Sequence, residues 1–277
     1  MIKVGVIMAV YNRLESTKKA LYYLYEVLKD YDVSVYILDD MSTDGTDAFL
    51  NTYYPEIAQI KGSGCLFWTG GMRKAWEFAS TNYHDYYLLL NNDTFLLPKA
   101  KFEFESLVKS EKMYVLVGAC RNETFDITYS GRTRDFSKCF PNGALQDIYF
   151  ANGNVMFVPN IVFLEIGNLS SCYTHGIGDF DYSFRCRKAG IDVFLSTEPV
   201  AICSENNYDV DKVFLEKKFV WRFINLNNPK LIPIFEYTYF KFKVNGLLCI
   251  LDFIKVLVRV LFPRIHQFYK GGWSWKS

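Results

Sequence analysis

This sequence has few histidines, no closely spaced pair of cysteines and almost no net charge. Its 277 residues include 31 Lys and Arg against 30 Asp and Glu, so the net charge is +1 and no global field attracts nucleic acid. Three His, and seven Cys with no CxxC pair, indicate neither a zinc cluster nor a disulfide framework. We therefore expect reduced thiols in a cytoplasmic protein that has no nucleic-acid partner.

Long hydrophobic runs are also missing. The charge-free stretch at 244–251 is much shorter than the roughly 20 residues that span a bilayer. The N-terminus runs directly into a strand pattern, which is not the layout of a signal peptide. Half of the residues are hydrophobic, so the chain suffices for one large domain, or for one domain with a C-terminal appendage.

Apolar runs of strand length alternate with helical patterns in the first half of the chain. Four strands are predicted at 4–10, 33–38, 57–61 and 86–90, with helices between them. This order predicts an α/β fold with a Rossmann-like, mainly parallel sheet and helices on both faces, whose strands all end at one edge. The second half is less regular. It predicts strands at 115–119, 127–132 and 155–158, a long loop at 134–147, and a helix from 179 to 189.

Polar residues follow the fourth predicted strand. Asn91-Asn92-Asp93 comes directly after five apolar residues, at a sheet edge where open α/β folds place their active sites. An Asp at this position either binds a divalent cation such as Mg²⁺ or begins a turn. Asp39 and Asp40, after the second strand, are expected on the same edge.

Several short motifs follow one another along the chain, and their order is informative. They are Val10-Tyr11-Asn12-Arg13, the segments 38–46 and 90–94, and Gly178-Asp179-Phe180-Asp181. Together they resemble the inverting glycosyltransferases of family two, which have a GT-A fold, over about 1–225. The segment 67–71 and the Asn-x-Asp form of the strand end are similar to those of bacterial rhamnosyltransferase-like polysaccharide enzymes. The resemblance implies a nucleotide-sugar half at about 1–95 and an acceptor half at about 96–225.

The resemblance implies an enzyme that transfers a hexose or deoxyhexose, with inversion. The donor would be a nucleotide diphosphate sugar, with UDP or dTDP favoured, and the acceptor a glycan or lipid-linked glycan in bacterial cell-surface polysaccharide synthesis, such as that of capsule or O-antigen. Two alternatives stay open. One is a nucleotidyltransferase that makes nucleotide sugars, although a Gly-rich, basic phosphate loop does not follow the first strand. The other is a non-catalytic module that binds nucleotides or glycans.

By the same resemblance, Asp179 is the catalytic base and Asp93 the ligand of Mg²⁺ or Mn²⁺. Asn91 replaces a carboxylate that the family often has, so the diphosphate and water would complete the metal site. Asp179 can also simply cap a helix. The donor-binding residues implied are Ala9, Tyr11, Asn12, Arg13, Asp39, Asp40, Trp68, Gly70, Gly71, Arg73, Asn91 and Asn92.

Asp40 would accept a hydrogen bond from the imide N–H of a uracil or thymine base, beside the Tyr11 ring, although a turn also accounts for an Asp here. Trp68 can be a core aromatic residue, and His175 a surface one. Asp181 suits the first turn of a helix, and Gly178 stands where the family often has Glu. The residues expected near the acceptor are Asn152, Gly153, His175, Gly178 and Asp181.

The segment 226–277 lies outside the resemblance and is predicted to be a helical, basic and aromatic extension. Between 247 and 262 the charges Asp252, Lys255 and Arg259 form one narrow stripe, so the rest of that helix needs a large apolar partner. One candidate is an anionic bilayer, bound peripherally at the inner face of the cell membrane through 244–277. The other is the catalytic domain or a second copy of the chain in a homo-oligomer.

Overall fold

The computed structural model describes residues 1–205 and 209–269. They form two compact units, of which one holds 1–174 and 178–205, and the other holds 175–177 and the chain from 206 onward. Residues 270–277 of the predicted basic and aromatic segment lie outside the described residues, so only the part of it up to 269 is described.

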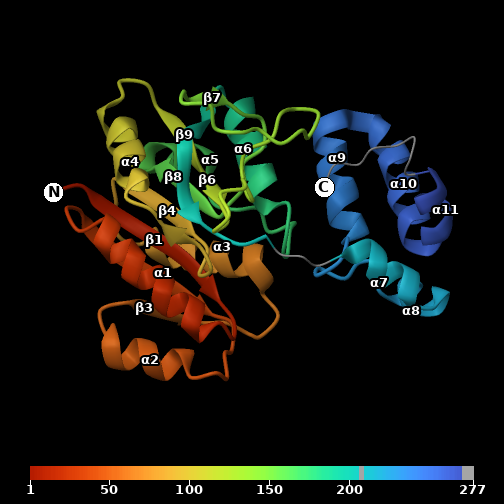
Figure 1. Ribbon diagram of the computed structural model, residues 1–277, viewed down its shortest axis with the longest axis horizontal. Helices are drawn as coiled ribbons and strands as arrows, with labels where there is room; N and C mark the ends of the chain where they lie inside the picture. Colours follow the sequence, from red (N-terminus) through yellow and green to blue (C-terminus); the bar gives the residue numbers. More distant parts are fainter. Residues whose placement is uncertain (206–208, 270–277) are drawn as a thin grey trace. The chain divides into compact units, whose positions relative to one another are not determined.

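The first unit is built on one mixed β-sheet, which confirms the predicted α/β class (Figure 1). Its order is β3-β2-β1-β4-β8-β6-β9-β5, with β7 paired to β9. The strands β1 to β4 are parallel as predicted, whereas β8 runs antiparallel to both β4 and β6. The strands are β1 Lys3–Val10, β2 Asp32–Asp39, β3 Ala58–Lys61, β4 Tyr86–Leu90, β5 Phe95–Leu96, β6 Tyr114–Arg121, β7 Gln146–Asp147, β8 Val155–Pro159 and β9 Asp192–Ile202.

Helices cover both faces of the sheet, because successive strand side chains point to opposite faces. Val6 and Met8 of β1 pack in a core with residues of α1, α2 and α4, while Ile7 packs in a second core with residues of α3, α5 and α6. Gly71 of α3 is required by close packing, since a Cβ there would lie 2.9 Å from the Cβ of Ala9. The helices are α1 Leu14–Val27, α2 Thr46–Tyr53, α3 Phe67–Ala79, α4 Lys99–Lys109, α5 Asn160–Ile166 and α6 Gly178–Lys188.

The strand predicted at 127–132 does not form. Its backbone makes isolated bridges instead, from Ile127 to Arg121 and from Arg132 to Lys138 and Phe150. The segment returns to the end of β6, where Cys120 exchanges backbone hydrogen bonds with Thr128 and Tyr129. The long loop predicted at 134–147 is irregular as expected, apart from the two residues of β7.

The second unit is helical among its described residues. Its own small core contains Phe214, Ile234, Val256 and Val260. None of the described helices is long and apolar enough to cross a membrane. The elements are α7 Val210–Glu216, α8 Phe219–Ile224, α9 Ile234–Asn245, the 3-10 helix η1 Gly246–Leu248, α10 Cys249–Leu261 and α11 Pro263–Tyr269.

Candidate active site

The strands β1, β2 and β4 end side by side. Val10, the last residue of β1, pairs with Asp39, the last residue of β2, and β4 pairs with β1 on its other side. In the loop after β1, Arg13 Nη1 forms an ion pair with Asp93 Oδ2 beyond the end of β4. The structure therefore brings Arg13 and Asp93 together at the carboxyl edge of the sheet.

The loops after β1 and β2 hold each other in place. The Asn12 backbone N–H donates to Ser42 Oγ at 3.0 Å, and the Thr43 N–H donates to Asn12 Oδ1 at 2.7 Å. Asn12 has a φ of 49°, in the left-handed region that asparagine tolerates better than most residues. The adjoining Tyr11 side chain is 52% exposed. A fixed loop thus presents an aromatic ring to any molecule bound at this edge.

Asp40 is buried and organises the chain that leads into α3. Its Oδ1 accepts a hydrogen bond from the Gly64 N–H at 2.7 Å, and its Oδ2 accepts one from the Leu66 N–H at 2.8 Å. A Cβ at Gly62 would lie 2.3 Å from Asp40 Oδ1, so only glycine fits there. A base N–H at Asp40 would have to use a second lone pair of an oxygen that already accepts one bond.

The two asparagines after β4 each have a protein partner. Asn91 Oδ1 accepts a hydrogen bond from Trp68 Nε1 at 2.6 Å. Asn92 is buried, and its Nδ2 donates to Thr17 Oγ1 of α1 at 3.1 Å. The Asn92 side chain therefore fastens the end of β4 to α1, and the Asn91 side chain connects it to α3.

Asp93 is the carboxylate available at this strand end, and its side chain is 25% exposed. Among the described residues, no three His, Cys, Asp or Glu side chains are grouped so that they could hold a metal ion. Asn91 Oδ1 is already bonded to Trp68, which leaves Asp93 as the charged oxygen donor. This donor set fits a cation only if a diphosphate and water supply most of the oxygen ligands.

Asp179, in the first turn of α6, is a carboxylate held almost entirely by the backbone. Its Oδ2 accepts from the Gly153 N–H at 2.8 Å, and its Oδ1 from the Phe180 N–H at 2.9 Å. Burial raises the pKa of Asp179 to about 6, although these two hydrogen bonds and the Arg132 guanidinium favour the charged form. Such a group can take up a proton near neutral pH, as a general base must.

Trp68 lies between the end of β4 and Gly153, whose backbone N–H binds Asp179. A Cβ at Gly153 would lie 2.5 Å from Trp68 Cη2 and 3.2 Å from Asp179 Cβ. The indole ring therefore covers Gly153, while its N–H binds Asn91. The Trp68 side chain therefore links the end of β4, next to the metal-ligand candidate Asp93, to Gly153, which binds the candidate base Asp179.

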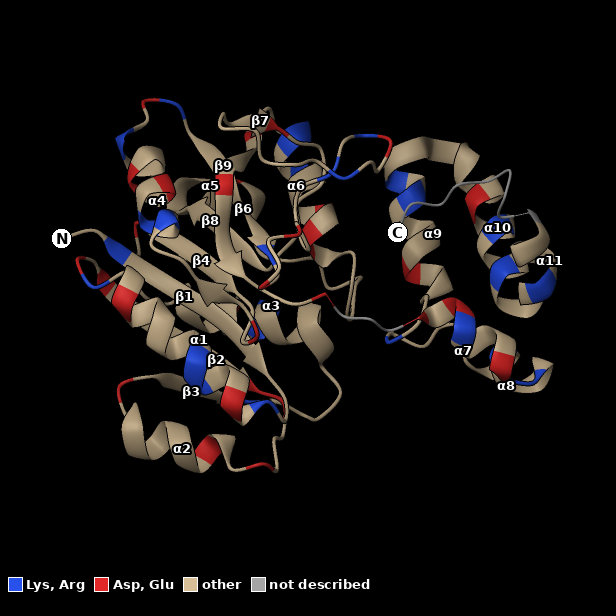
Figure 2. Ribbon diagram, in the orientation of Figure 1, with Lys and Arg blue, Asp and Glu red and all other residues tan. Residues whose placement is uncertain are grey.

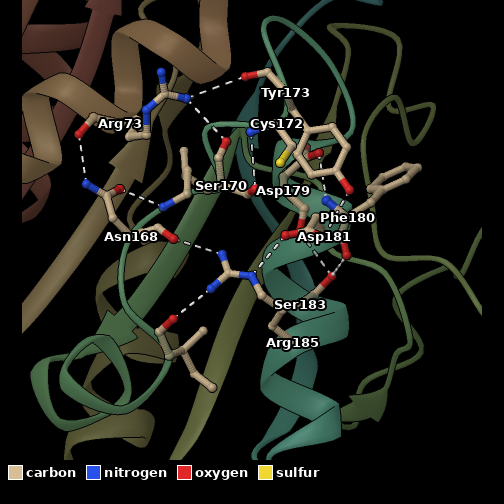
Figure 3. Close-up of polar contacts among 12 residues, drawn as sticks. Arg73, Asn168, Ser170, Cys172, Tyr173, Asp179, Phe180, Asp181, Ser183 and Arg185 are labelled. Carbon is tan, nitrogen blue, oxygen red and sulfur yellow. Dashed lines mark hydrogen bonds and ion pairs between the residues drawn. The ribbon is translucent and has the colours of Figure 1, made fainter. Parts of the chain in front are cut away.

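Asp181 lies two residues after Asp179 and has different partners (Figure 3). It is fully buried, accepts from Tyr173 Oη at 3.1 Å and pairs with Arg185 Nε at 2.9 Å. Arg185 in turn donates to the carbonyl oxygens of Ile166 and Asn168. The arrangement is that of an internal ion pair that fixes the loop before α6.

Arg73 of α3 binds the same loop, as Figure 3 shows. Its Nη1 donates to the carbonyl oxygens of Ser170 at 3.2 Å and Tyr173 at 3.5 Å, and its own carbonyl accepts from Asn168 Nδ2 at 2.9 Å. The Gly70 N–H donates to Thr174 O at 3.2 Å. Helix α3 thus supports the 168–174 loop, and a direct donor role for Arg73 stays a prediction.

Gly178 is explained by a close contact with α3. A Cβ at this position would lie 2.4 Å from Thr69 Cγ2 and 2.6 Å from Thr69 Oγ1. A glutamate could not be placed there without moving a buried threonine. Of the other residues expected near the acceptor, Asn152 accepts the Asn154 N–H at 3.1 Å through its Oδ1, and His175 is exposed and belongs to the second unit.

Three neighbours of the site were missed by the sequence analysis. Lys61 Nζ lies 3.6 Å from Asp39 Oδ2; since Lys61 ends the strand next to β2, its position in the predicted sheet was a usable signal. Thr69 lies within the segment 67–71 that carries part of the resemblance, so its segment was a usable signal, although its contact with Gly178 was not. Arg132 carried no such signal, because it reaches the site from a segment whose path the sequence does not define. Arg132 is in the segment that was predicted to be a strand.

Comparisons with known proteins agree with this geometry. Residues 5–167 match the family model described as Glycosyl transferase family 2. No curated protein matches the chain significantly. Similar folds are TarS from S. aureus (TM-score 0.56, 12% identity, covering 95% of this chain and 45% of that one) and the mannosyltransferase PcManGT from Pyrobaculum calidifontis, in complex with GDP-Man and Mn²⁺ (TM-score 0.55, 13% identity, covering 97% and 79%). A TarS 1–349 structure contains UDP-GlcNAc (TM-score 0.56, 11% identity, covering 95% and 83%).

Proposed function

The chain belongs to glycosyl transferase family 2, and from this we propose that it transfers a sugar from a nucleotide diphosphate donor to a hydroxyl group, with Asp179 as the base. The carrying observation is the buried Asp179 carboxylate, with a pKa of about 6, which the Gly153 N–H and the Trp68 ring hold next to the end of β4. Family membership favours sugar transfer over both nucleotidyl transfer and simple binding.

In the proposed reaction, the acceptor oxygen attacks the anomeric carbon as the bond from that carbon to the diphosphate oxygen breaks. The hydroxyl proton passes to Asp179, and the diphosphate leaves with the bonding electron pair. A single displacement of this kind inverts the anomeric centre. A bound Mg²⁺ or Mn²⁺ would neutralise charge on the leaving diphosphate, and Asp93 is the residue that would hold it.

The donor would lie along the carboxyl edge of the sheet. The exposed Tyr11 ring would pack beside a pyrimidine base, for which we favour UDP or dTDP. The buried Asp40 carboxylate would accept the base N–H through a second lone pair of an oxygen that already binds the Gly64 or Leu66 N–H. Arg13, which now pairs with Asp93, is a cation for the diphosphate once a metal ion competes for that carboxylate. Of the other predicted donor residues, Asp39 ends β2, and Gly70 and Gly71 lie near the start of α3.

The acceptor would approach Asp179 from the side of Asn152 and Gly153. We propose a glycan or lipid-linked glycan of a bacterial surface polysaccharide, and a hexose or deoxyhexose as the transferred sugar. A lipid-linked acceptor would place the reaction in the cytoplasm at the inner face of the cell membrane.

A nucleotide-release screen tests the proposal. The purified chain is offered UDP-, dTDP- and GDP-sugars with Mg²⁺ or Mn²⁺, with and without a chelator. We expect release from one class of donor, lost on chelation. An Asp30→Asn variant, altered at the opposite edge of the sheet near the start of β2, is the matched control and should keep full activity. Release from none of the donors, or equal release by Asp179→Asn, would show that the assignment is wrong.

A further inference from the structure

Helix α10 turns charged residues toward the helical unit and exposes apolar residues. Arg259 Nε pairs with Asp211 Oδ1 of α7 at 2.6 Å, and both side chains are mostly buried, at 25% and 14% exposed. Asp252 accepts from Asn245 Nδ2 at 3.3 Å. Two of the three charges of the stripe therefore make contacts inside the helical unit, and an apolar part of the helix is exposed.

The outward part is a continuous apolar face. Leu247, Ile250, Leu251 and Ile254 are 77%, 56%, 57% and 50% exposed. Their spacing of three, four and seven residues puts them on one side of η1 and α10. We call these four residues the α10 apolar face.

Neighbouring helices of the same unit have the same character. On α9, Phe235, Tyr239 and Phe242 are 66%, 44% and 50% exposed, again at helical spacing. On α8, Val220 and Ile224 are 67% and 75% exposed. Soluble proteins rarely expose so many large apolar side chains close together in the chain, and such groups mark interaction surfaces.

The charge of the chain is divided unevenly between its two parts. Residues 206–277 contain 12 Lys and Arg against 5 Asp and Glu, a net charge of +7, whereas residues 1–205 contain 19 against 25, a net charge of −6. Figure 2 shows Lys and Arg positions along α7, α9, α10 and α11. An apolar face on a strongly basic helical unit is the combination that binds anionic lipid surfaces.

The other possible occupants fit less well. A second copy of the helical unit would place two segments that each have a net charge of +7 against each other, and they would repel. A catalytic unit is negative, but its exposed large apolar residues, such as Tyr22, Phe78, Phe102 and Leu164, are dispersed over α1, α3, α4 and α5 and offer no matching face. An anionic bilayer supplies both the apolar medium and the opposite charge.

We propose that the helical unit binds an anionic membrane surface, with the α10 apolar face inserted at the level of the lipid headgroups and the Lys and Arg residues of the unit held by lipid phosphates. This differs from a spanning segment, since the face is only about two helical turns long. The proposal does not depend on the sugar-transfer reaction and holds for any activity of the catalytic unit.

Flotation of the full chain with lipid vesicles tests it. Wild type is mixed with vesicles of phosphatidylcholine alone or with phosphatidylglycerol added. The Leu251→Glu/Ile254→Glu double variant removes the apolar face at two exposed positions, so folding should be preserved, as checked by circular dichroism. The matched control is Ile161→Glu/Leu164→Glu on α5, where the side chains are 49% and 68% exposed.

Wild type and the α5 control should float with the anionic vesicles and not with the neutral ones. The α10 double variant should bind at least about tenfold less, because burying each Leu or Ile side chain raises the binding constant by more than about tenfold. Equal flotation of the α10 variant, or no flotation of wild type, would overturn the proposal. A wild-type dimer that this variant alone makes monomeric, without lipid binding by either, would identify a second copy as the occupant and also overturn it. Nucleotide release in the absence of lipid should be unchanged, which separates this result from the donor screen.

Discussion

The two sides of the first turn of α6 place the same residue type in opposite circumstances. On one side, Asp181 is bonded to a phenol and a guanidinium, which keep it as a buried ion-pair partner. On the other side, Asp179 accepts hydrogen bonds from two backbone N–H groups and has the Arg132 guanidinium nearby, but burial outweighs these and raises its pKa to about 6. Residues two apart on a helix point in nearly opposite directions. The partners on each side, and not the residue type, separate a structural carboxylate from a reactive one.

The largest expected effect is that of Asp179→Asn on sugar transfer. The amide cannot accept the hydroxyl proton, so kcat should fall about 10² to 10⁴-fold, the usual contribution of a general base. Initial rates with the donor found in the nucleotide-release screen measure this. If kcat stays within a factor of three while the fold is intact, the two sides of the turn do not differ in the way described.

Asp181→Ala should instead act on stability. It leaves Arg185 buried without its carboxylate, and breaking a buried pair costs about 3 to 5 kcal/mol of unfolding free energy. Urea unfolding measures the loss, and Asp30→Asn, in an exposed pair with Lys101, should unfold like wild type. A stable Asp181→Ala protein with no activity would show that Asp181, like Asp179, takes part in the reaction.

The pH dependence of Asp179 gives two slopes of opposite sign. The base must be ionised, so kcat/KM should rise about tenfold per pH unit up to about pH 6 and level off above it. The free energy of unfolding should fall as the pH rises from about 4 to 6. In that window Asp179 keeps its proton in the folded state, whereas the unfolded chain has already lost it. The loss relative to Asp179→Asn is at most about 3 kcal/mol, from two units of pKa. Parallel stability curves for the two proteins would contradict the raised pKa.

The smallest expected effect is that of Trp68→Phe. Phenylalanine has no ring N–H, so the hydrogen bond to Asn91 is lost, at a cost of about 0.5 to 1.5 kcal/mol or roughly three- to tenfold in kcat/KM. Because Asn91 adjoins the metal-ligand candidate, the metal concentration that gives half-maximal rate should rise. Trp76→Phe, a buried change elsewhere on α3, is the control and should leave that concentration unchanged.

The order of strands and helices at the start of the chain could be predicted from sequence, since each element carries its own periodicity. Strands β1 to β4 and the edge where they end follow from local patterns. The positions of β8, β5 and β7 do not, because antiparallel insertion between β4 and β6 depends on contacts between distant segments. The strand prediction at 127–132 was wrong for the same reason: the segment makes only isolated bridges, to Arg121, Lys138 and Phe150, and its own residues do not define these partners.

In the candidate site, too, the residues that follow predicted strands could be predicted, whereas their partners from distant segments could not. Asp93, Arg13 and Asp40 follow predicted strands, so their shared edge could be foreseen. The partners that decide what each residue does could not: Trp68 for Asn91, Thr17 for Asn92, and the loop 168–174 for Arg73. A motif specifies which side chains enter the site, whereas their remaining partners come from other parts of the fold.

The contact between Thr69 and Gly178 makes two distant positions genetically dependent on each other. A side chain can be added at 178 only if 69 becomes smaller, so the change at 178 is harmful alone and tolerable once position 69 has changed. A mutational path toward a larger residue before Asp179 must therefore pass through α3 first. Laboratory evolution of this enzyme for new acceptors would have to vary both codons together, and a library that randomises only the first turn of α6 would miss every such solution.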